Sequence, residues 1–205
     1  MHGTETRTLL RETGETRVAV TMTRHSGGTP PTIAVATGLA FLDHMMTVLA
    51  RYASLDLVLN ATGDQGHHLI EDVAITMGLA FAESLPPTAA RYGHRTIPMD
   101  DALVEAALDA GGRPYYRGPL PSSLYDHWMR SFADNARVTL HVRVLRGRDR
   151  HHIVEAAFKA LGLAVRDAMM EGESVFSTKG AVAVAREMGG GGDGRAVDGH
   201  GLVSD

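Results

Sequence analysis

The N-terminal half of the chain shows two kinds of hydrophobic periodicity. Residues 16–23 alternate apolar and polar side chains, as a half-buried β-strand does, and residues 33–37 and 55–59 alternate in the same way. Residues 39–53 and 67–84 instead carry apolar side chains at the spacing of an amphipathic helix. The pattern therefore predicts the order strand, strand, helix, strand, helix.

The second half of the chain repeats the motifs of the first. The Asp-His pair that ends at His44 recurs at His127, and the His-His-x-x-Glu motif of residues 67–71 recurs at residues 151–155. An alternating strand lies between the two motifs in both halves, and the intervals between them differ by a single residue. Three matched elements in the same order indicate a duplicated gene. We expect each half to be a small α+β unit whose sheet covers two helices, with the helices of both halves packed together.

This repeat divides the chain into three segments. We expect a first α+β repeat at residues 1–90, a second at residues 91–186, and a flexible glycine-rich tail at residues 187–205. His200 lies in that tail, where a lone histidine is far more often solvated than bound to a metal.

Composition restricts the possible chemistry and partners. The chain has no cysteine, so a metal would have to be held by imidazole and carboxylate groups, and its formal net charge of -4 offers no basic surface for nucleic acid. It has neither an apolar N-terminal stretch typical of a secretory signal nor eighteen consecutive apolar residues. We therefore expect a cytoplasmic protein that binds neither nucleic acid nor membranes.

The paired histidines carry the candidate chemistry. Side chains advance by about 100° per residue on a helix, so Glu71 would lie between His67 and His68 on one face. Residues 151–155 repeat this geometry. A single histidine on a helix is usually only hydrogen-bonded or exposed. Two such sets favour metal ligation, because adjacent imidazoles beside a carboxylate are costly to bury without a charge to neutralise.

Several neighbours of these motifs extend the hypothesis. His44 and His127 add one imidazole per half, and the mixture of imidazole and carboxylate suits manganese, iron or zinc. Asp43 and Asp72 leave two interpretations open: each either orients a ligating imidazole or carries a surface charge at a helix end.

Five motifs follow one another along the chain. They are FLDHM from Phe41, HHLIEDVAI from His67, GRPY from Gly112, HHIVEAAFKAL from His151 and STKG from Ser177. In this order they resemble the motifs of the imidazoleglycerol-phosphate dehydratase family, over about residues 7–182. The resemblance implies a metal-dependent hydro-lyase of histidine biosynthesis that converts imidazole glycerol phosphate to imidazole acetol phosphate and water. It also implies an α+β fold with two four-stranded mixed sheets flanking a central four-helix layer, similar to domain 2 of ribosomal protein S5.

The resemblance also implies the roles of individual residues. Two Mn²⁺ ions per site would be held by His44, His67, His68, Glu71, His127, His151, His152 and Glu155. The proton would be moved by Glu15, Glu71 or Glu155, which the sequence does not rank. The substrate phosphate would be bound by Arg91, Arg113, Ser177 and Lys179. The family implies a homo-oligomer, a 24-mer with sites between subunits, in which the metal stabilises an imidazolate form of the substrate.

Two other functions remain open. The chain could be a diverged, non-catalytic oligomer that keeps its metals for assembly, or a metal-dependent phosphohydrolase that uses the same ions to activate water. Glu15, Arg113 and Lys179 are not metal ligands, and they favour the dehydratase because a scaffold would need no phosphate clamp.

Overall fold

The computed structural model describes residues 5–172, and within them the same series of elements occurs twice. The first series is β1 (Thr6–Glu12), β2 (Thr16–Arg24), β3 (Ile33–Ala36), α1 (Ala40–Ala53), β4 (Leu55–Gly63) and α2 (Gly66–Ser84). The second series is β5 (Tyr92–Met99), β6 (Ala102–Ala110), β7 (Tyr115–Arg117), α3 (Ser123–Ala136), β8 (Val138–Arg146) and α4 (Arg150–Ala168). The predicted duplication is confirmed.

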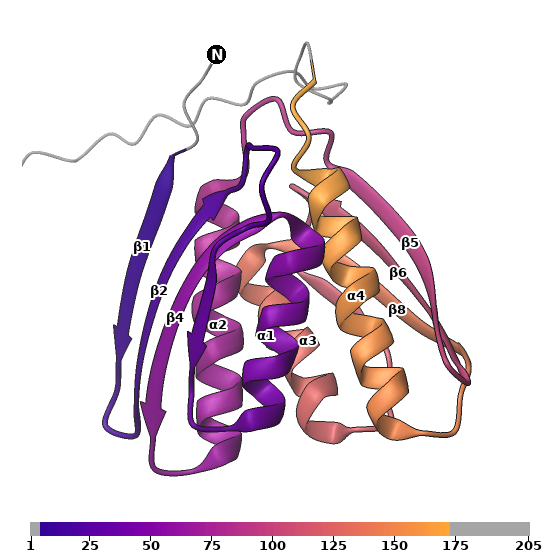
Figure 1. Ribbon diagram of the computed structural model, residues 1–205, viewed down its shortest axis with the longest axis horizontal. Helices are drawn as coiled ribbons and strands as arrows, with labels where there is room; N and C mark the ends of the chain where they lie inside the picture. The colour runs from indigo at the N-terminus through magenta and orange to yellow at the C-terminus, as the bar shows by residue number, and fades with distance from the viewer. Residues whose placement is uncertain (1–4, 173–205) are drawn as a thin grey trace, which may run out of the picture.

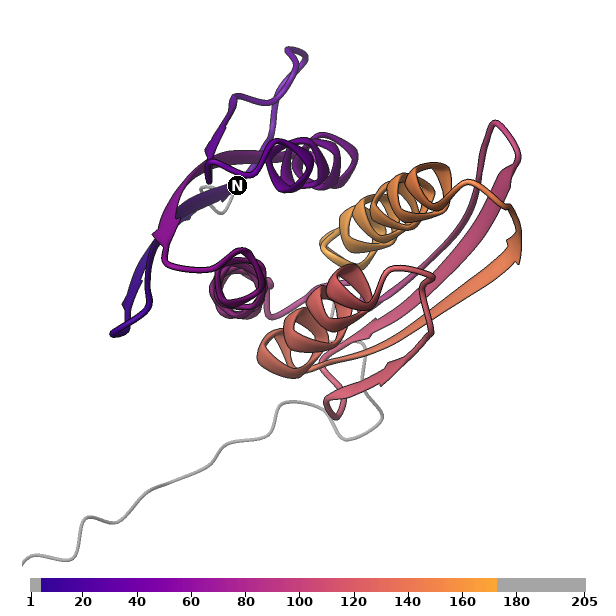
Figure 2. The same cartoon turned by 90° about the horizontal axis from the view of Figure 1, so that it is seen from below.

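Each series forms one four-stranded mixed sheet. The strand orders are β1-β2-β4-β3 and β5-β6-β8-β7, so the two sheets have the same topology. In both sheets the first two pairings are antiparallel and the last is parallel. Figure 2 shows the sheets on the outside and the four helices between them. The predicted α+β architecture, with two four-stranded sheets flanking a helical layer, is confirmed.

The helices of the two repeats pack against each other in pairs. Helix α1 contacts α4, and α2 contacts α3, so each pair contains one helix from either repeat. All four helices begin at the same end of the molecule (Figure 1). The N-terminal turns that carry the histidine motifs are therefore gathered at that end.

Two glycines allow these helix pairs to approach closely. A Cβ atom on Gly78 of α2 would lie 2.7 Å from the carbonyl oxygen of Phe132 in α3, and one on Gly162 of α4 would lie 2.9 Å from that of Leu49 in α1. Both distances are too short for a side chain, so the absence of Cβ sets the helix spacing. The two glycines occupy matching places in the two repeats.

The core is a continuous apolar layer between helices and sheets. Alternate residues of the central strands β2, β4, β6 and β8 are buried against the helices. Trp128 is fully buried, and its ring stacks on Phe132 at 5.3 Å between centroids and meets Phe158 at 4.8 Å. Among residues 5–172 there is no helix with the length and apolar character needed to cross a membrane.

Candidate active site and metal centre

The N-terminal turns of the four helices carry all eight predicted metal ligands. Helices α1 and α3 each contribute one histidine, and α2 and α4 each contribute a His-His-x-x-Glu set. These ligands are His44, His67, His68, Glu71, His127, His151, His152 and Glu155. Helix N-termini carry positive partial charge, which favours carboxylates at this end of the molecule.

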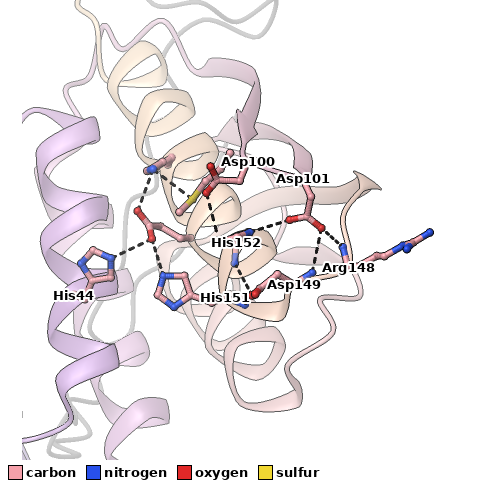
Figure 3. A network of polar contacts seen from close by, with 10 residues as sticks. His44, Asp100, Asp101, Arg148, Asp149, His151 and His152 are labelled. Carbon is pink, nitrogen blue, oxygen red and sulfur yellow. Dashed lines mark hydrogen bonds and ion pairs between the residues drawn. The ribbon is translucent and has the colours of Figure 1, made fainter.

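One cluster joins α1 of the first repeat to α4 of the second. The Nε2 atoms of His44 and His151 each lie 3.1 Å from Oε2 of Glu155 (Figure 3). Both imidazoles are exposed, whereas Glu155 is buried, and the two rings stack at 6.1 Å between centroids. One ligand atom from each residue lies within 4.8 Å of the others. Two imidazoles and an ionised carboxylate at this spacing fit the donor set of one divalent transition metal.

A second cluster crosses the repeats in the opposite direction. His127 Nε2 on α3 lies 3.3 Å from Glu71 Oε1 on α2. His67, at the position that matches His151, lies against the ring of His68 with 4.0 Å between centroids. Each histidine from α1 or α3 therefore meets the glutamate of the other repeat.

The second histidine of the α4 motif faces the turn between β5 and β6. His152 Nδ1 lies 2.8 Å from Asp101 Oδ1, and its Nε2 lies 3.4 Å from Asp100 Oδ2 (Figure 3). The hydrogen bond with Asp101 raises the pKa of His152. Hydrogen bonds from His152 and from the backbone N–H groups of Arg148 and Asp149 lower the pKa of Asp101 to about 2. Sequence reasoning did not single out Asp101, since the β5–β6 turn was not predicted.

The matching histidine of α2 faces the turn between β1 and β2. His68 Nδ1 lies 3.1 Å from Asp64 Oδ1 and 3.4 Å from Glu15 Oε2. The hydrogen bond with Asp64 and the nearby Glu15 charge raise the pKa of His68 against the effect of desolvation. Glu15, predicted as a catalytic residue, thus lies beside the predicted ligand His68. The side chain of Glu15 is largely exposed.

A lysine completes the surroundings of Glu155. Lys159 Nζ lies 3.0 Å from Glu155 Oε1, 3.5 Å from Met99 Sδ and 5.9 Å from the centre of the Tyr52 ring. Burial acts to raise the pKa of Glu155, but hydrogen bonds from Lys159 and His44 outweigh it and leave the pKa lowered. Glu155 is therefore ionised near neutral pH. Sequence reasoning gave Lys159 no role, although its position one turn after Glu155 was a usable indication.

Asp43 supports its own helix rather than an imidazole. Its Oδ1 accepts hydrogen bonds from the backbone N–H and the hydroxyl of Thr37, at 2.8 and 2.6 Å. The matching Asp126 accepts from the Tyr116 hydroxyl at 2.6 Å and from the Leu120 N–H at 2.9 Å. Both aspartates thus fix the segment that leads into a helix.

Asp72 fits neither interpretation offered by the sequence. It is buried, so it is not a surface charge, and in the described chain its carboxylate contacts Arg11 and Thr16 rather than an imidazole.

The predicted phosphate-binding arginines lie at the other end of the molecule. Arg91 donates its backbone N–H to the carbonyl of Ala168, where α4 ends, and Arg113 follows the end of β6 nearby. From His151 to Ala168, α4 is about 25 Å long at about 1.5 Å per residue. Within one chain, these arginines are therefore separated from the metal cluster by about the length of α4.

The guanidinium of Arg91 is already paired. It binds the Asp109 carboxylate through Nε at 2.6 Å and Nη2 at 3.1 Å, and this raises the pKa of Arg91. Ser177 and Lys179, the other predicted phosphate ligands, lie outside the described residues.

The chain matches known proteins over most of its length. Residues 37–165 match the family model described as imidazoleglycerol-phosphate dehydratase. An imidazoleglycerol-phosphate dehydratase of Oleidesulfovibrio alaskensis is 41% identical over 192 residues, covering 85% of this chain and 96% of the relative. One from Salinibacter ruber is 42% identical over 196 residues, covering 87% of this chain and 96% of the relative.

Solved structures of the same family align with this chain. The crystal structure of the enzyme from Pyrococcus furiosus in complex with (S)-C348 aligns with a TM-score of 0.75 at 39% identity, covering 85% of this chain and 100% of that one. The enzyme from Staphylococcus aureus aligns with a TM-score of 0.69 at 28% identity, covering 82% of this chain and 100% of that one. The protein belongs to the imidazoleglycerol-phosphate dehydratase family.

Proposed function

We propose that this protein removes water from imidazole glycerol phosphate, giving imidazole acetol phosphate, at a metal centre held by the histidines and glutamates of the four helix N-termini. Its family membership makes it a hydro-lyase of histidine biosynthesis. The observation that carries the proposal is the cluster of His44, His151 and Glu155, which two repeats build together from three side chains.

The donor set fits a pair of divalent ions. The clusters around Glu155 and Glu71 each combine imidazole with carboxylate, a mixture suited to Mn²⁺, and we take Mn²⁺ as the ion, two per site, held by the eight predicted ligands. When bound, such an ion supplies a Lewis acid and a template for the imidazole ring of the substrate.

The glutamates of the site differ in their freedom to move a proton. Glu155 is buried and engaged by two histidines and Lys159, which suits a fixed ligand. Glu15 lies in the turn between β1 and β2, beside His68, and its side chain is 59% exposed. In this proposal the reaction breaks a C–H and a C–O bond on neighbouring carbons. Glu15 accepts the proton from the C–H bond, and the leaving hydroxide takes up one proton, from the protonated Glu15 or from solvent, to become water. Glu71, 40% exposed and paired with His127, serves as a ligand in this scheme.

The phosphate clamp is supplied by another subunit in this proposal. Arg113 and Arg91 lie about the length of α4 from His151, roughly 25 Å at 1.5 Å per residue, and a small substrate does not span that distance. We therefore assign them, with Ser177 and Lys179, to the site of a neighbouring copy in a homo-oligomer, the 24-mer that the family resemblance implies.

Product analysis tests the reaction. The manganese-loaded protein is incubated with imidazole glycerol phosphate, and both the acetol phosphate and free phosphate are measured. Acetol phosphate without free phosphate is the expected result; free phosphate would point to a phosphohydrolase, and neither product to a scaffold. Size-exclusion chromatography with and without a chelator shows whether the metals also hold subunits together.

A further inference from the structure

A buried carboxylate on α2 has no place in the metal cluster. Asp72 follows Glu71 directly, yet it points toward strands β1 and β2, where its Oδ2 accepts a hydrogen bond from the Thr16 hydroxyl. The Nη1 atom of Arg11 lies 2.8 Å from the same oxygen as an ion pair, without an aligned hydrogen bond in the described chain. A buried charge with a hydroxyl donor and a cation is a fixed element of structure.

Thr16 is one of several points that fix the turn between β1 and β2. The hydroxyl of Thr13 accepts the backbone N–H groups of Glu15 at 3.2 Å and Thr16 at 3.0 Å. The carbonyl of Glu15 accepts the N–H of Asp64 at 3.0 Å. The link from Thr16 to Asp72 ties this turn to α2, the helix that carries three predicted metal ligands.

The second repeat serves as an internal comparison. Asp101 directly precedes β6 as Glu15 directly precedes β2, and it is held by His152 at 2.8 Å and by two backbone N–H groups. At the position that matches Asp72, the second repeat has Ala156, which is buried. The buried carboxylate is therefore specific to the repeat that carries Glu15.

We propose that Asp72 is a positioning residue that acts through Thr16 to hold Glu15 at the reacting carbons. This inference rests on the role given to Glu15 in the proposed function. Catalytic geometry is held by such supporting contacts, and a misplacement of about 1 Å costs up to roughly a hundredfold in rate.

The test removes the hydroxyl while keeping the size of the side chain. Thr16→Val is expected to lower kcat on the order of tenfold to a hundredfold with little change in KM. Thr16→Ser keeps the hydroxyl, so its kcat should stay near the wild-type value. Manganese content and oligomer size should stay as in the wild type. The matched control is Thr76→Val, a buried threonine on α2 whose hydroxyl donates to the Asp72 backbone carbonyl rather than its carboxylate.

A second background separates positioning from general support of the structure. In Glu15→Gln, the further change Thr16→Val should cost nothing, because the group that it positions is already lost. Equal losses in both backgrounds, or wild-type kcat in Thr16→Val, would overturn the proposal. So would full activity of Glu15→Gln, which removes the residue to be positioned.

A readout independent of turnover distinguishes this inference from the proposed function. Hydrogen exchange at the amides of Glu15 and Asp64 should accelerate in Thr16→Val and not in Thr76→Val. If the wild-type protein does not turn over imidazole glycerol phosphate, the proposed function is refuted. The exchange rates would still decide whether Asp72 holds the turn through Thr16: unchanged rates in Thr16→Val would reject that role.

Discussion

Replacing Glu155 by glutamine tests the metal centre most directly. Glutamine keeps the size of the side chain but removes the charge that faces His44 and His151 at 3.1 Å each. An uncharged amide is a poor ligand for a divalent transition metal. We expect one equivalent of manganese to be lost per site. Outer contacts of a metal site cost about 10- to 100-fold when removed, so turnover should fall by at least about a hundredfold.

The structure also predicts a cost in stability for Glu155→Gln. Lys159 and Glu155 have side chains that are only 18% and 10% exposed, so the ammonium loses its counter-ion in a poorly hydrated place. Breaking a buried pair costs about 3–5 kcal/mol, and the amide oxygen still accepts one hydrogen bond, so we expect about 1–3 kcal/mol. Adding Lys159→Met removes the stranded charge and should restore most of the stability without restoring turnover.

The assay combines elemental analysis, turnover of imidazole glycerol phosphate and urea unfolding of the metal-free protein. Glu83→Gln is the control, because Glu83 is an exposed glutamate at the far end of α2. Wild-type manganese content and turnover in Glu155→Gln would refute the assignment of this cluster as a metal site. A turnover loss with unchanged metal content would leave Glu155 as an acid-base group instead.

Three further predictions address assembly, packing and pH. Arg113→Ala and His151→Ala should each be inactive. Mixed oligomers of the two variants should regain a fraction of wild-type turnover, because some sites then combine an intact Arg113 from one chain with an intact His151 from another. No recovery would mean that both residues act in the site of a single subunit. Gly162→Ala should lower the free energy of unfolding by about 1–3 kcal/mol in a urea titration, since the new Cβ would meet a backbone oxygen of α1 at 2.9 Å; an unchanged value would mean that α1 and α4 are not in this contact. His25 has one ring nitrogen 3.0 Å from the Asp56 carboxylate and the other 2.7 Å from a backbone carbonyl, and these hydrogen bonds raise its pKa. The stability that protonated His25 adds is complete below the ordinary pKa of 6.5 and is lost as pH rises through the raised pKa. The difference in unfolding free energy between wild type and His25→Gln should therefore shrink above pH 6.5. A difference independent of pH would contradict this.

The sequence predicted the parts of the fold that depend on local pattern. The strands near residues 16–23 and 55–59 and the helices near 39–53 and 67–84 lie where the alternation and the helical spacing placed them. The duplication could be predicted because the motifs recur at nearly equal intervals. Strand β1 was missed, because at the sheet edge its seven residues alternate between exposed and half-buried, which leaves no strong apolar pattern.

Contacts between the repeats could not be predicted from the sequence. Helical spacing places His67 and His68 near Glu71, but it says nothing about the partner that another helix brings. In the structure that partner is His127 from the other repeat, through a helix pairing that only tertiary packing decides. The same holds for Asp72, whose burial and contact with β2 depend on the turn between β1 and β2.

The crossing of the repeats makes each half depend on the other, although the two clusters are not alike. Each glutamate meets a histidine from the other repeat, so neither half carries a complete cluster. At the position of Lys159 the first repeat has Ile75, and its Glu71 side chain is 40% exposed against 10% for Glu155. One cluster therefore has a buried glutamate with a lysine counter-ion, whereas the glutamate of the other is open to solvent on α2, the helix that faces Glu15. In the proposed function the two copies would therefore differ in role: the buried Glu155 would be a fixed metal ligand, and the open side near Glu71 would leave room for Glu15 to move a proton.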